Sequence, residues 1–254
     1  ELVAQCRDIA LPSAEFDIPG QTPRRVLARA TPLRGTGGSV LVMHDITEMR
    51  RLETIRRDFV ANVSHELRTP VSIILANSET LLEGAIDDPR HARGFVQALA
   101  RNAERLSRII ADLLDLSRIE SGQYTIDSSA VEAGQAARRA VEAVEAMARD
   151  KQISIESTAA DDLQVRADSK LLDQILLNLL HNAVKYTPGG GRIAVHARQA
   201  DGMVRFEVED NGVGVAPRHR DRIFERFYRV DPGRSRDMGD TGLGLSIVKH
   251  LAEA

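Results

Sequence analysis

Residues 59–72 read FVANVSHELRTPVS and place His65, Glu66, Thr69 and Pro70 within six positions. Apolar residues recur around them at steps of three and four, which is the spacing of an amphipathic helix. The apolar stripe keeps its phase on both sides of Pro70. We therefore predict one continuous, kinked helix rather than a second helix that starts at Pro70 with Thr69 as its N-cap. A proline inside a helix frees the carbonyl four residues back, here that of Glu66, and weakens the turn that carries His65.

The side chains of this stretch are suited to nucleophilic chemistry. His65 lies off the apolar stripe, so we expect its imidazole to face solvent, where a neutral ring nitrogen is a good nucleophile near neutral pH. Glu66 can accept the proton of the other ring nitrogen, and Thr69, one turn further, offers a hydroxyl that can position a water. A lone histidine on a helix is more often inert surface. No second His or Cys stands at zinc-ligand spacing, which argues against a metal site here.

The composition is that of an ordinary globular protein. The 254 residues are 43% hydrophobic and 28% charged, and the formal net charge of −3 argues neither for a nucleic-acid partner, which we do not expect, nor for an acidic tail. The one cysteine, Cys6, excludes an internal disulfide. No apolar run of about 18 residues is present, so we expect no membrane contact within this chain. It lacks an initiator Met and a signal-peptide pattern, so we expect an upstream region to be missing.

The pattern divides the chain into three predicted domains. Residues 1–45 are short alternating runs separated by turn residues, too few for a full domain, and we interpret them as the C-terminal part of one. Residues 46–122 predict two long helices in an antiparallel hairpin, the second ending at Gly122 as C-cap. One hairpin cannot bury both of its apolar faces, so a second copy is the expected partner, in a homodimeric four-helix bundle. Residues 123–254 alternate between helix and strand patterns.

This last region predicts a sheet with helices on one face, and the chain as a whole an α+β multidomain protein. Asp168 is a plausible N-cap, and Asp201-Gly202 is a hairpin turn signal. The predicted elements are a helix over 131–148, strands over 152–157 and 163–167, a helix from 168 to about 185, strands over 191–199 and 203–210, a short helix near 218–224 and a last helix from Leu243.

Asn178, Asn182 and Lys185 stand at i, i+4 and i+7, on one face of the predicted helix. Asparagine is a poor helix former, so two on one face need a reason. One interpretation is a solvated face. The other is that the amide oxygen of Asn182 ligates Mg²⁺ while Lys185 faces a phosphate, since Mg²⁺ takes hard oxygen ligands and often only one or two from protein.

Two glycine-rich segments follow. In DNGVGV, residues 210–215, Asp210 can accept a hydrogen bond from an adenine amino group, and Gly212 and Gly214 allow close backbone approach. An ordinary turn is the alternative. In DTGLGLSIV, residues 240–248, the glycines stand where a loop enters a helix, and free backbone N–H groups there suit a phosphate. The residues concerned are Gly242, Leu243 and Gly244. No Gly-Lys-Ser/Thr follows, so this is no P-loop.

Between these segments lies RIFERFYRVDPGRSRDMGD, residues 222–240. Phe224, Phe227 and Tyr228 are either core or an apolar hinge. The polar run after Arg229 lacks apolar periodicity and predicts a mobile loop suited to closing over a ligand. Arg229 could meet the terminal phosphate of a nucleotide, although a solvated arginine is the commoner case.

The segment VSHELRTP resembles the phosphoacceptor box of bacterial sensor histidine kinases of the His-Glu-x-x-Thr, PhoR-like subclass. In that family the matching histidine is phosphorylated, the glutamate is its acid–base partner, and the threonine supports removal of phosphate from the partner regulator. These residues are His65, Glu66 and Thr69. DQILLNLLHNAVKYT resembles the asparagine box of the family, with Tyr186 as its usual aromatic. The order of the boxes across residues 46–254 resembles the whole catalytic core.

The resemblance implies a function as well as a fold. The ATP-binding part resembles the α/β sandwich shared with gyrase and heat-shock ATPases, here without the two strands that follow the last helix in the family. The implied activity is autophosphorylation of His65 from ATP and Mg²⁺, transfer to an aspartate of a response regulator receiver domain, and phosphatase activity toward that regulator. The rival interpretations are a gyrase-like ATPase without a histidine acceptor, a dimeric ATP-binding scaffold and a phosphatase-dominant protein.

The N-terminal 45 residues resemble the end of a PAS-type sensor domain, with HDIT at its exit into the signalling helix. By the same resemblance we expect this part of the protein to be cytoplasmic and the full-length protein to be anchored in the bacterial inner membrane.

Overall fold

The computed structural model describes residues 13–20, 22–33, 38–120, 126–159, 163–231 and 241–253. The chain divides into two compact units, Glu1–Ser64 and His65–Ala254. Helix α1, Thr47–Leu82, contributes residues to both. None of the helices in these ranges is long and apolar enough to cross a membrane.

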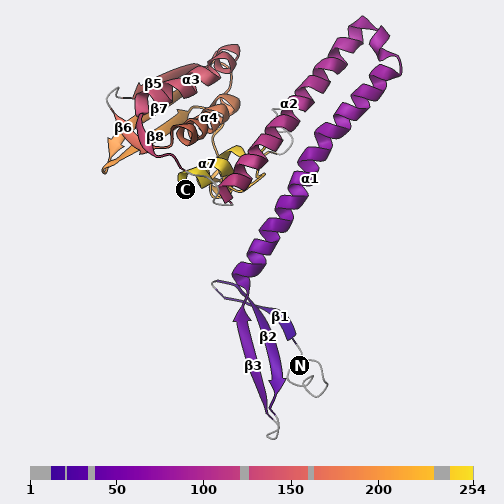
Figure 1. Cartoon of the computed structure of the whole chain (residues 1–254), viewed down its shortest axis with the longest axis vertical. Helices are drawn as coiled ribbons and strands as arrows, with labels where there is room; N and C mark the ends of the chain where they lie inside the picture. The colour runs from indigo at the N-terminus through magenta and orange to yellow at the C-terminus, as the bar shows by residue number, and fades with distance from the viewer. Residues whose placement is uncertain are drawn as a thin grey trace. The chain divides into compact units, whose positions relative to one another are not determined.

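The N-terminal unit contains an antiparallel three-stranded sheet in the order β1-β2-β3 (Figure 1). Its strands are β1 (Ser13–Ile18), β2 (Arg24–Pro32) and β3 (Ser39–Asp45). They follow the alternating runs that predicted strands, because each alternate side chain points to the same face of a pleated strand. Val26, Ala28 and Ala30 of the central strand are buried.

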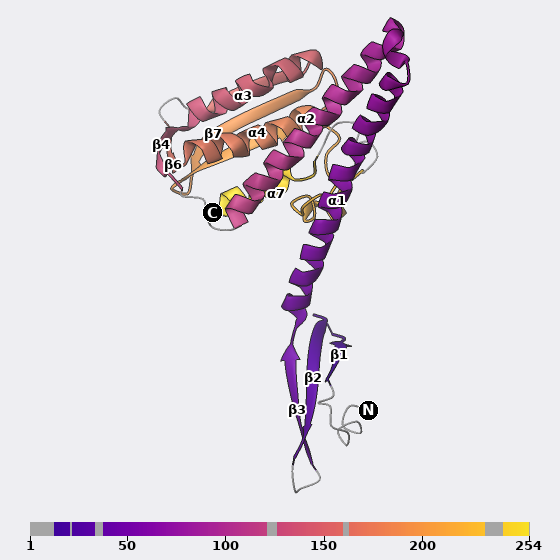
Figure 2. The same cartoon turned by 45° about the vertical axis from the view of Figure 1, so that its right-hand side comes forward.

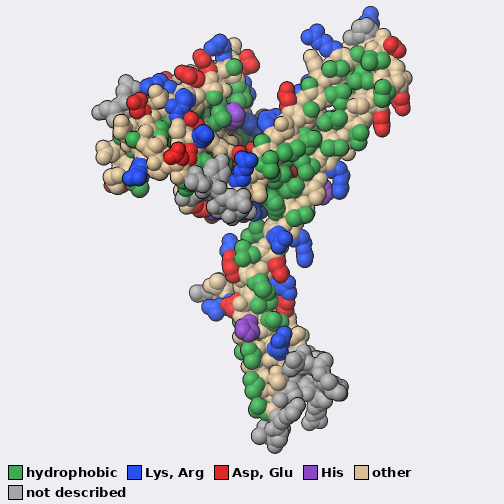
Figure 3. Space-filling view, in the orientation of Figure 1, with side chains coloured by type: hydrophobic (Ala, Val, Ile, Leu, Met, Phe, Trp, Pro, Cys, Tyr) green, Lys and Arg blue, Asp and Glu red, His purple; other side chains and the backbone are tan. Residues whose placement is uncertain are grey.

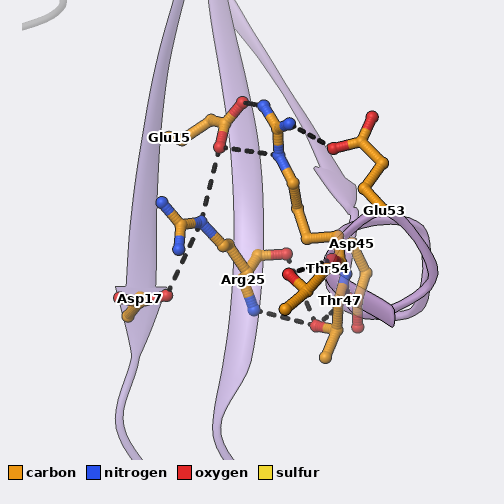
Figure 4. A network of polar contacts seen from close by, with 8 residues as sticks. Glu15, Asp17, Arg25, Asp45, Thr47, Glu53 and Thr54 are labelled. Atoms are coloured by element: carbon orange, nitrogen blue, oxygen red, sulfur yellow. Dashed lines mark hydrogen bonds and ion pairs between the residues drawn. The ribbon is translucent and has the colours of Figure 1, made fainter. Parts of the chain in front are cut away.

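A network of polar contacts joins this sheet to the first turns of α1 (Figure 4). The Arg50 guanidinium donates to the Glu15 carboxylate of β1, and the Arg25 Nε of β2 lies 3.4 Å from the same carboxylate. The Arg50 guanidinium holds the pKa of Glu15 below its usual range. Thr47 Oγ1 accepts a hydrogen bond from the Arg25 N–H at 2.8 Å, and Asp45 accepts one from the Thr47 N–H at 3.0 Å. The start of α1 is thus fixed to all three strands.

The two long helices predicted from the apolar periodicity are present. Helix α1 runs through Pro70 without a break, as predicted, and the Pro70 side chain is buried. The turn after α1 contains Gly84 in the left-handed region, at φ 119°, and the short 3₁₀ helix η2, Ala85–Asp87. Helix α2, Pro89–Glu120, then returns. The predicted C-cap at residue 122 lies outside the described residues.

The rest of the second unit mixes helices and strands. In the sheet β5-β7-β8 the first pair is parallel and the second antiparallel, while β4 pairs antiparallel with β6. Helices α3 and α4 cover one face of β5-β7-β8 (Figures 1 and 2). The elements are β4 (Ser129–Glu132), α3 (Ala133–Asp150), β5 (Ser154–Ala159), β6 (Gln164–Ala167), α4 (Ser169–Tyr186), β7 (Arg192–Ala200), β8 (Met203–Asp210), α5 (Pro217–Arg220) and α7 (Gly244–Glu253).

The core of this part lies between the two helices and the sheet. Burial is complete for Val144 of α3, Leu176 and Leu180 of α4, and Ile193 and Val195 of β7, each at 0% exposure. These residues belong to one apolar cluster, to which alanines of α3 also contribute. The alanines let α3 approach α4 closely, because small side chains keep the two backbones near each other.

Two predicted boundaries in this region are wrong. The helix predicted over 131–148 begins at Ala133, because Ser129–Glu132 forms strand β4 and pairs with β6. That pairing depends on residues more than thirty positions away, so local pattern alone favoured helix. The short helix predicted near 218–224 is confined to Pro217–Arg220 and starts with proline in its first turn. The predicted hairpin turn is confirmed, with Asp201 and Gly202 both at positive φ.

Candidate active site

Helix α4 carries the first part of the candidate site. Its N-terminus is capped as predicted, because the Asp168 carboxylate accepts hydrogen bonds from the Lys170 N–H at 2.9 Å and the Leu171 N–H at 3.2 Å. Backbone N–H donors, that of Asp127 first, hold the pKa of Asp168 below its usual value. One face of the helix enters the core through residues such as Leu176. The opposite face is left to line a cavity.

This cavity has a volume of about 880 Å³ and is formed by the C-terminal half of α4, the end of β8, the segment after it and the start of α7. Most of the predicted nucleotide-binding residues line it. They are Asn182, Lys185, Tyr186, Asp210, Gly214, Arg229, Gly242 and Gly244. The Lys185 ammonium lies 5.3 Å from the centre of the Tyr186 ring. Residues that are far apart in sequence therefore meet around one space of a size that suits a nucleotide.

Three predicted residues lie beside this cavity rather than on its lining. Asn178 is packed against the second glycine-rich segment, here called the glycine loop (Gly242 to Gly244). Its Oδ1 lies 3.5 Å from where a Cβ on Gly244 would stand. A Cβ on Gly212 would come within 2.6 Å of the Tyr186 carbonyl oxygen, so only glycine fits there. Leu243 is fully buried. Each of the three therefore lies next to residues that line the cavity: Asn178 and Leu243 beside Gly244, and Gly212 beside Tyr186.

Gly242 has a backbone conformation that the other residues rarely adopt. Its φ is 71°, and an added Cβ would stand 2.9 Å from the Cα of Phe227. The Phe227 N–H donates to the Gly242 carbonyl at 2.8 Å, and Phe227 is itself at φ 61°. A non-glycine residue at positive φ costs of order 1 kcal/mol, so this contact holds a strained segment in place.

The aromatic residues before this contact have different environments. Phe224 is 39% exposed, so of the two alternatives left open for it, core does not apply. The Tyr228 hydroxyl lies 2.6 Å from His219 Nδ1. The segment after Arg229 that was predicted to be a mobile loop lies outside the described residues from position 232 to 240.

His65 is exposed on α1, as its position off the apolar stripe predicts. The Thr69 hydroxyl donates to the His65 carbonyl at 3.2 Å, one turn back along the helix. The Glu66 carboxylate is directed to arginines rather than to the neighbouring imidazole. Arg105 of α2 donates to Glu66 Oε2 at 2.8 Å, and Arg229 donates to both carboxylate oxygens, each at 2.9 Å.

This ion-pair cluster connects the stretch of α1 that carries His65 to the cavity. Arg229 lines the cavity and at the same time forms a bidentate pair with Glu66, the residue next to His65. The side chains are 5% exposed for Arg229, 13% for Glu66 and 10% for Arg105. At such low exposure a bidentate guanidinium–carboxylate pair is strong, and removing one partner leaves a buried charge.

Two further contacts to α2 flank this cluster. The Thr241 hydroxyl, which precedes the glycine loop, donates to Asp112 at 2.8 Å and accepts from the Leu243 N–H at 3.2 Å. Gln174 of α4 donates to Asp115 at 2.8 Å. Sequence reasoning missed Asp112, Asp115 and Arg105 of α2, because their partners lie 59 or more residues away for the two aspartates and 39 for Arg105.

In the described part of the chain no group of three or more His, Cys, Asp or Glu side chains could hold a metal ion. The polar residues that line the cavity include an asparagine, two aspartates, a histidine, lysines and arginines, together with the two glycines at the start of α7. This donor set suits a phosphorylated ligand rather than a protein-bound metal cluster.

The chain matches two protein families over separate stretches. Residues 55–122 match the His Kinase A (phospho-acceptor) domain, and residues 167–254 match the Histidine kinase-, DNA gyrase B-, and HSP90-like ATPase. The chain is 41% identical over 214 residues to the sensor-like histidine kinase SenX3 of Mycolicibacterium smegmatis, covering 84% of this chain and 56% of that protein. The chain belongs to the sensor histidine kinases.

The chain is also similar to the phosphate regulon sensor protein PhoR of Pseudomonas aeruginosa, with 40% identity over 222 residues that cover 86% of this chain and 49% of PhoR. It therefore spans about half the length of these relatives. Full-length ShkA, solved in complex with AMPPNP, superposes with a TM-score of 0.57 at 34% identity, covering 77% of this chain and 40% of that one. The predicted α+β class, with a helical hairpin and a gyrase-like ATP-binding domain, is confirmed.

Proposed function

We propose that this kinase transfers the γ-phosphoryl group of ATP to a ring nitrogen of His65. The N–P bond forms as the bond between the γ-phosphorus and the bridging oxygen breaks, and ADP leaves. The observation that carries the proposal is the position of Arg229, which lines the candidate nucleotide cavity and pairs with the residue next to His65. One side chain thus links the phosphate source to the acceptor.

The cavity has a polar group for each part of Mg-ATP. Asp210 at one end suits the adenine amino group, and Lys185 together with the N–H groups at Gly242 and Gly244 suits the phosphates. The Asn182 amide oxygen would hold Mg²⁺, which supplies charge neutralisation for the leaving phosphate and needs only one or two protein ligands. The match to an ATPase family and the AMPPNP complex of ShkA support ATP as the nucleotide.

Glu66 would handle the charge that develops on the imidazole. When one ring nitrogen attacks phosphorus, the other carries a proton that a nearby carboxylate stabilises or accepts. Both oxygens of Glu66 are engaged by Arg229, so the bidentate pair has to open before the carboxylate can serve His65. Arg229 would then turn toward the transferring phosphate, where a guanidinium stabilises negative charge, while Arg105 keeps Glu66 in place.

The exposed residues of the hairpin point to two protein partners. Exposed His65 would pass its phosphoryl group to an aspartate of a response regulator receiver domain, and Thr69 would support the reverse removal of phosphate from that regulator. A second copy of this chain would cover the apolar side chains that gather along α1 and α2 (Figure 3). In the second unit, the exposed large apolar residues of the hairpin are Val71, Ile73, Leu75 and Leu82 of α1, Ile86 of η2, and Val96, Ile110 and Leu114 of α2.

The division into domains at 1–45, 46–122 and 123–254 stays a prediction, as do the PAS-type origin of the first domain and membrane anchoring of the full-length protein. The curated relatives that are twice as long leave room for such additional regions.

Incubation with γ-labelled ATP and Mg²⁺ tests the proposal, using the wild-type chain and His65→Gln. We expect label on the wild-type chain that survives alkali and is lost in acid, which is the behaviour of a phosphoramidate, and no label on His65→Gln. ATP hydrolysis without label on the protein would support the gyrase-like ATPase instead. Nucleotide binding with neither hydrolysis nor label would support a scaffold.

A further inference from the structure

Lys151, the residue after α3, reaches across to the end of α4. Its ammonium donates to the carbonyl oxygens of Val184 and Lys185, each at 2.8 Å, and lies 3.4 Å from that of Thr187. The last carbonyls of a helix have no partner within the helix and form the negative end of its dipole. Lys151 therefore caps the C-terminus of α4 from another element. An ammonium has three N–H donors, and these three carbonyls can engage all of them.

The backbone of Lys151 is tied to the same region. Its carbonyl accepts a hydrogen bond from the Gly190 N–H at 3.1 Å. A Cβ added to Gly189 would stand 3.2 Å from that carbonyl oxygen, so the turn after α4 packs directly on it. The side chain and the main chain of one residue thus hold both the helix end and the turn that follows.

The end of α4 and the turn after it, which Lys151 contacts, extend to the part of the candidate nucleotide site where we place the adenine. Lys185 and Tyr186 line the cavity. The Tyr186 carbonyl accepts from the Val213 N–H at 3.5 Å and blocks any side chain at Gly212. The Gly212 N–H in turn donates to Asp210 at 2.9 Å. A series of hydrogen bonds and neighbouring residues therefore runs from the Lys151 ammonium, through the backbone of residues 185–186 and 212–213, to the Asp210 carboxylate that suits the adenine.

We propose that Lys151 is a positioning residue for the nucleotide: by neutralising and fixing the end of α4, it sets the places of Lys185, Tyr186 and Asp210. The inference rests on the ATP site of the proposed function. Lys151 also lines the cavity. Its ammonium is directed to carbonyls of the chain, so it acts through these residues and not as a phosphate ligand.

Isothermal titration of the whole chain with Mg-ATP, paired with thermal unfolding, tests this role. Lys151→Met keeps the length of the side chain and removes its charge. Lys151→Arg keeps a cation within reach of the same carbonyls. Lys170→Met makes the same change at the other end of α4, where the side chain is exposed. Val144→Ala leaves a cavity in the core on α3 and lowers stability without touching the site.

We expect Lys151→Met to weaken Mg-ATP binding about tenfold, since charge-assisted hydrogen bonds are lost. Lys151→Arg should recover most of that affinity. Lys170→Met should bind like wild type, and Val144→Ala should bind like wild type despite a lower melting temperature. In phosphorylation assays the loss should appear as a raised KM for Mg-ATP with Lys151→Met, and Val144→Ala should keep the wild-type KM.

Two results would overturn the inference. If Lys151→Met binds Mg-ATP as tightly as wild type, Lys151 has only a structural role and the proposed function stands. If the wild-type chain itself binds no Mg-ATP, the proposed function fails and this inference fails with it.

Discussion

At the scale of single residues, Asp168 shows how one side chain sets the geometry of the site. Its carboxylate accepts hydrogen bonds from the backbone N–H groups of Lys170, Leu171 and Asp127. The cap fixes where α4 begins, and so where Asn182 and Lys185 stand about four to five turns later. The cap could be predicted from sequence because its two partners in the helix, Lys170 and Leu171, are local, whereas the bond from Asp127, 41 residues earlier, could not.

Replacing Asp168 with Ala should lower the free energy of unfolding at neutral pH by about 1 kcal/mol, which is typical of a lost N-cap. The pKa of Asp168 is depressed in the folded state. Its contribution is therefore complete above the unfolded pKa of about 3.9 and is lost as pH falls through the folded pKa. Urea unfolding of both proteins as a function of pH measures the difference.

Asp150→Ala is the matched control, because Asp150 is an exposed carboxylate at the C-terminal end of α3. We expect it to stay within about 0.5 kcal/mol of wild type at every pH. A gap between wild type and Asp168→Ala that stays constant down to the lowest pH would contradict the role of the charged carboxylate.

Other residues of the site could not be predicted, and the reason is the same for each. Arg105 pairs with Glu66 39 residues earlier, and Lys151 caps carbonyls 33 to 36 residues later. In the sequence, neither Arg105 nor Lys151 can be distinguished from an ordinary surface cation. Their roles come from tertiary packing that brings distant segments together, and no local pattern encodes such a contact.

At the scale of elements, hydrophobic periodicity predicted the long helices and the hairpin β7-β8. The helices repeat the apolar pattern over many turns, and the hairpin combines alternation with an Asp-Gly turn. Strand β4 was missed because its four residues run into an alanine-rich helix and are strand only through pairing with β6. Long, regular elements are thus predictable, and short strands that depend on a distant partner are not.

The junction between the glycine loop and α7 gives a prediction at this scale. Gly242→Ala should weaken nucleotide binding at least tenfold or destabilise the second unit by more than 1 kcal/mol, because a Cβ at φ 71° meets the Phe227 backbone at 2.9 Å. Thermal unfolding and Mg-ATP titration measure both effects.

Gly94→Ala in α2 is the control for that variant. A Cβ there meets nothing within 4 Å and the glycine is inside a helix, so the change should raise stability by about 0.5 to 1 kcal/mol and leave binding unchanged. If Gly242→Ala binds and unfolds like wild type, the loop is not held as the structure indicates.

At the scale of the second unit, the site depends on contacts between the hairpin of α1 and α2 and the part that contains β4 to α7, here called the ATP-binding lobe. Arg229 pairs with Glu66, Thr241 with Asp112, and Gln174 with Asp115. Each joins a residue of the lobe to one on α1 or α2. The motifs in the sequence predicted the hairpin and the lobe. They did not predict the polar side chains through which the hairpin and the lobe contact each other.

The central claim is that this lobe delivers the terminal phosphate of ATP to His65. Mass-spectrometric mapping of the wild-type chain after incubation with Mg-ATP, kept at neutral or alkaline pH throughout, tests it most directly. The account predicts a phosphoryl group on the imidazole of His65, and none at this position when the nucleotide is omitted. Tight ATP binding with His65 unmodified, or with the phosphate on a different residue, would contradict it.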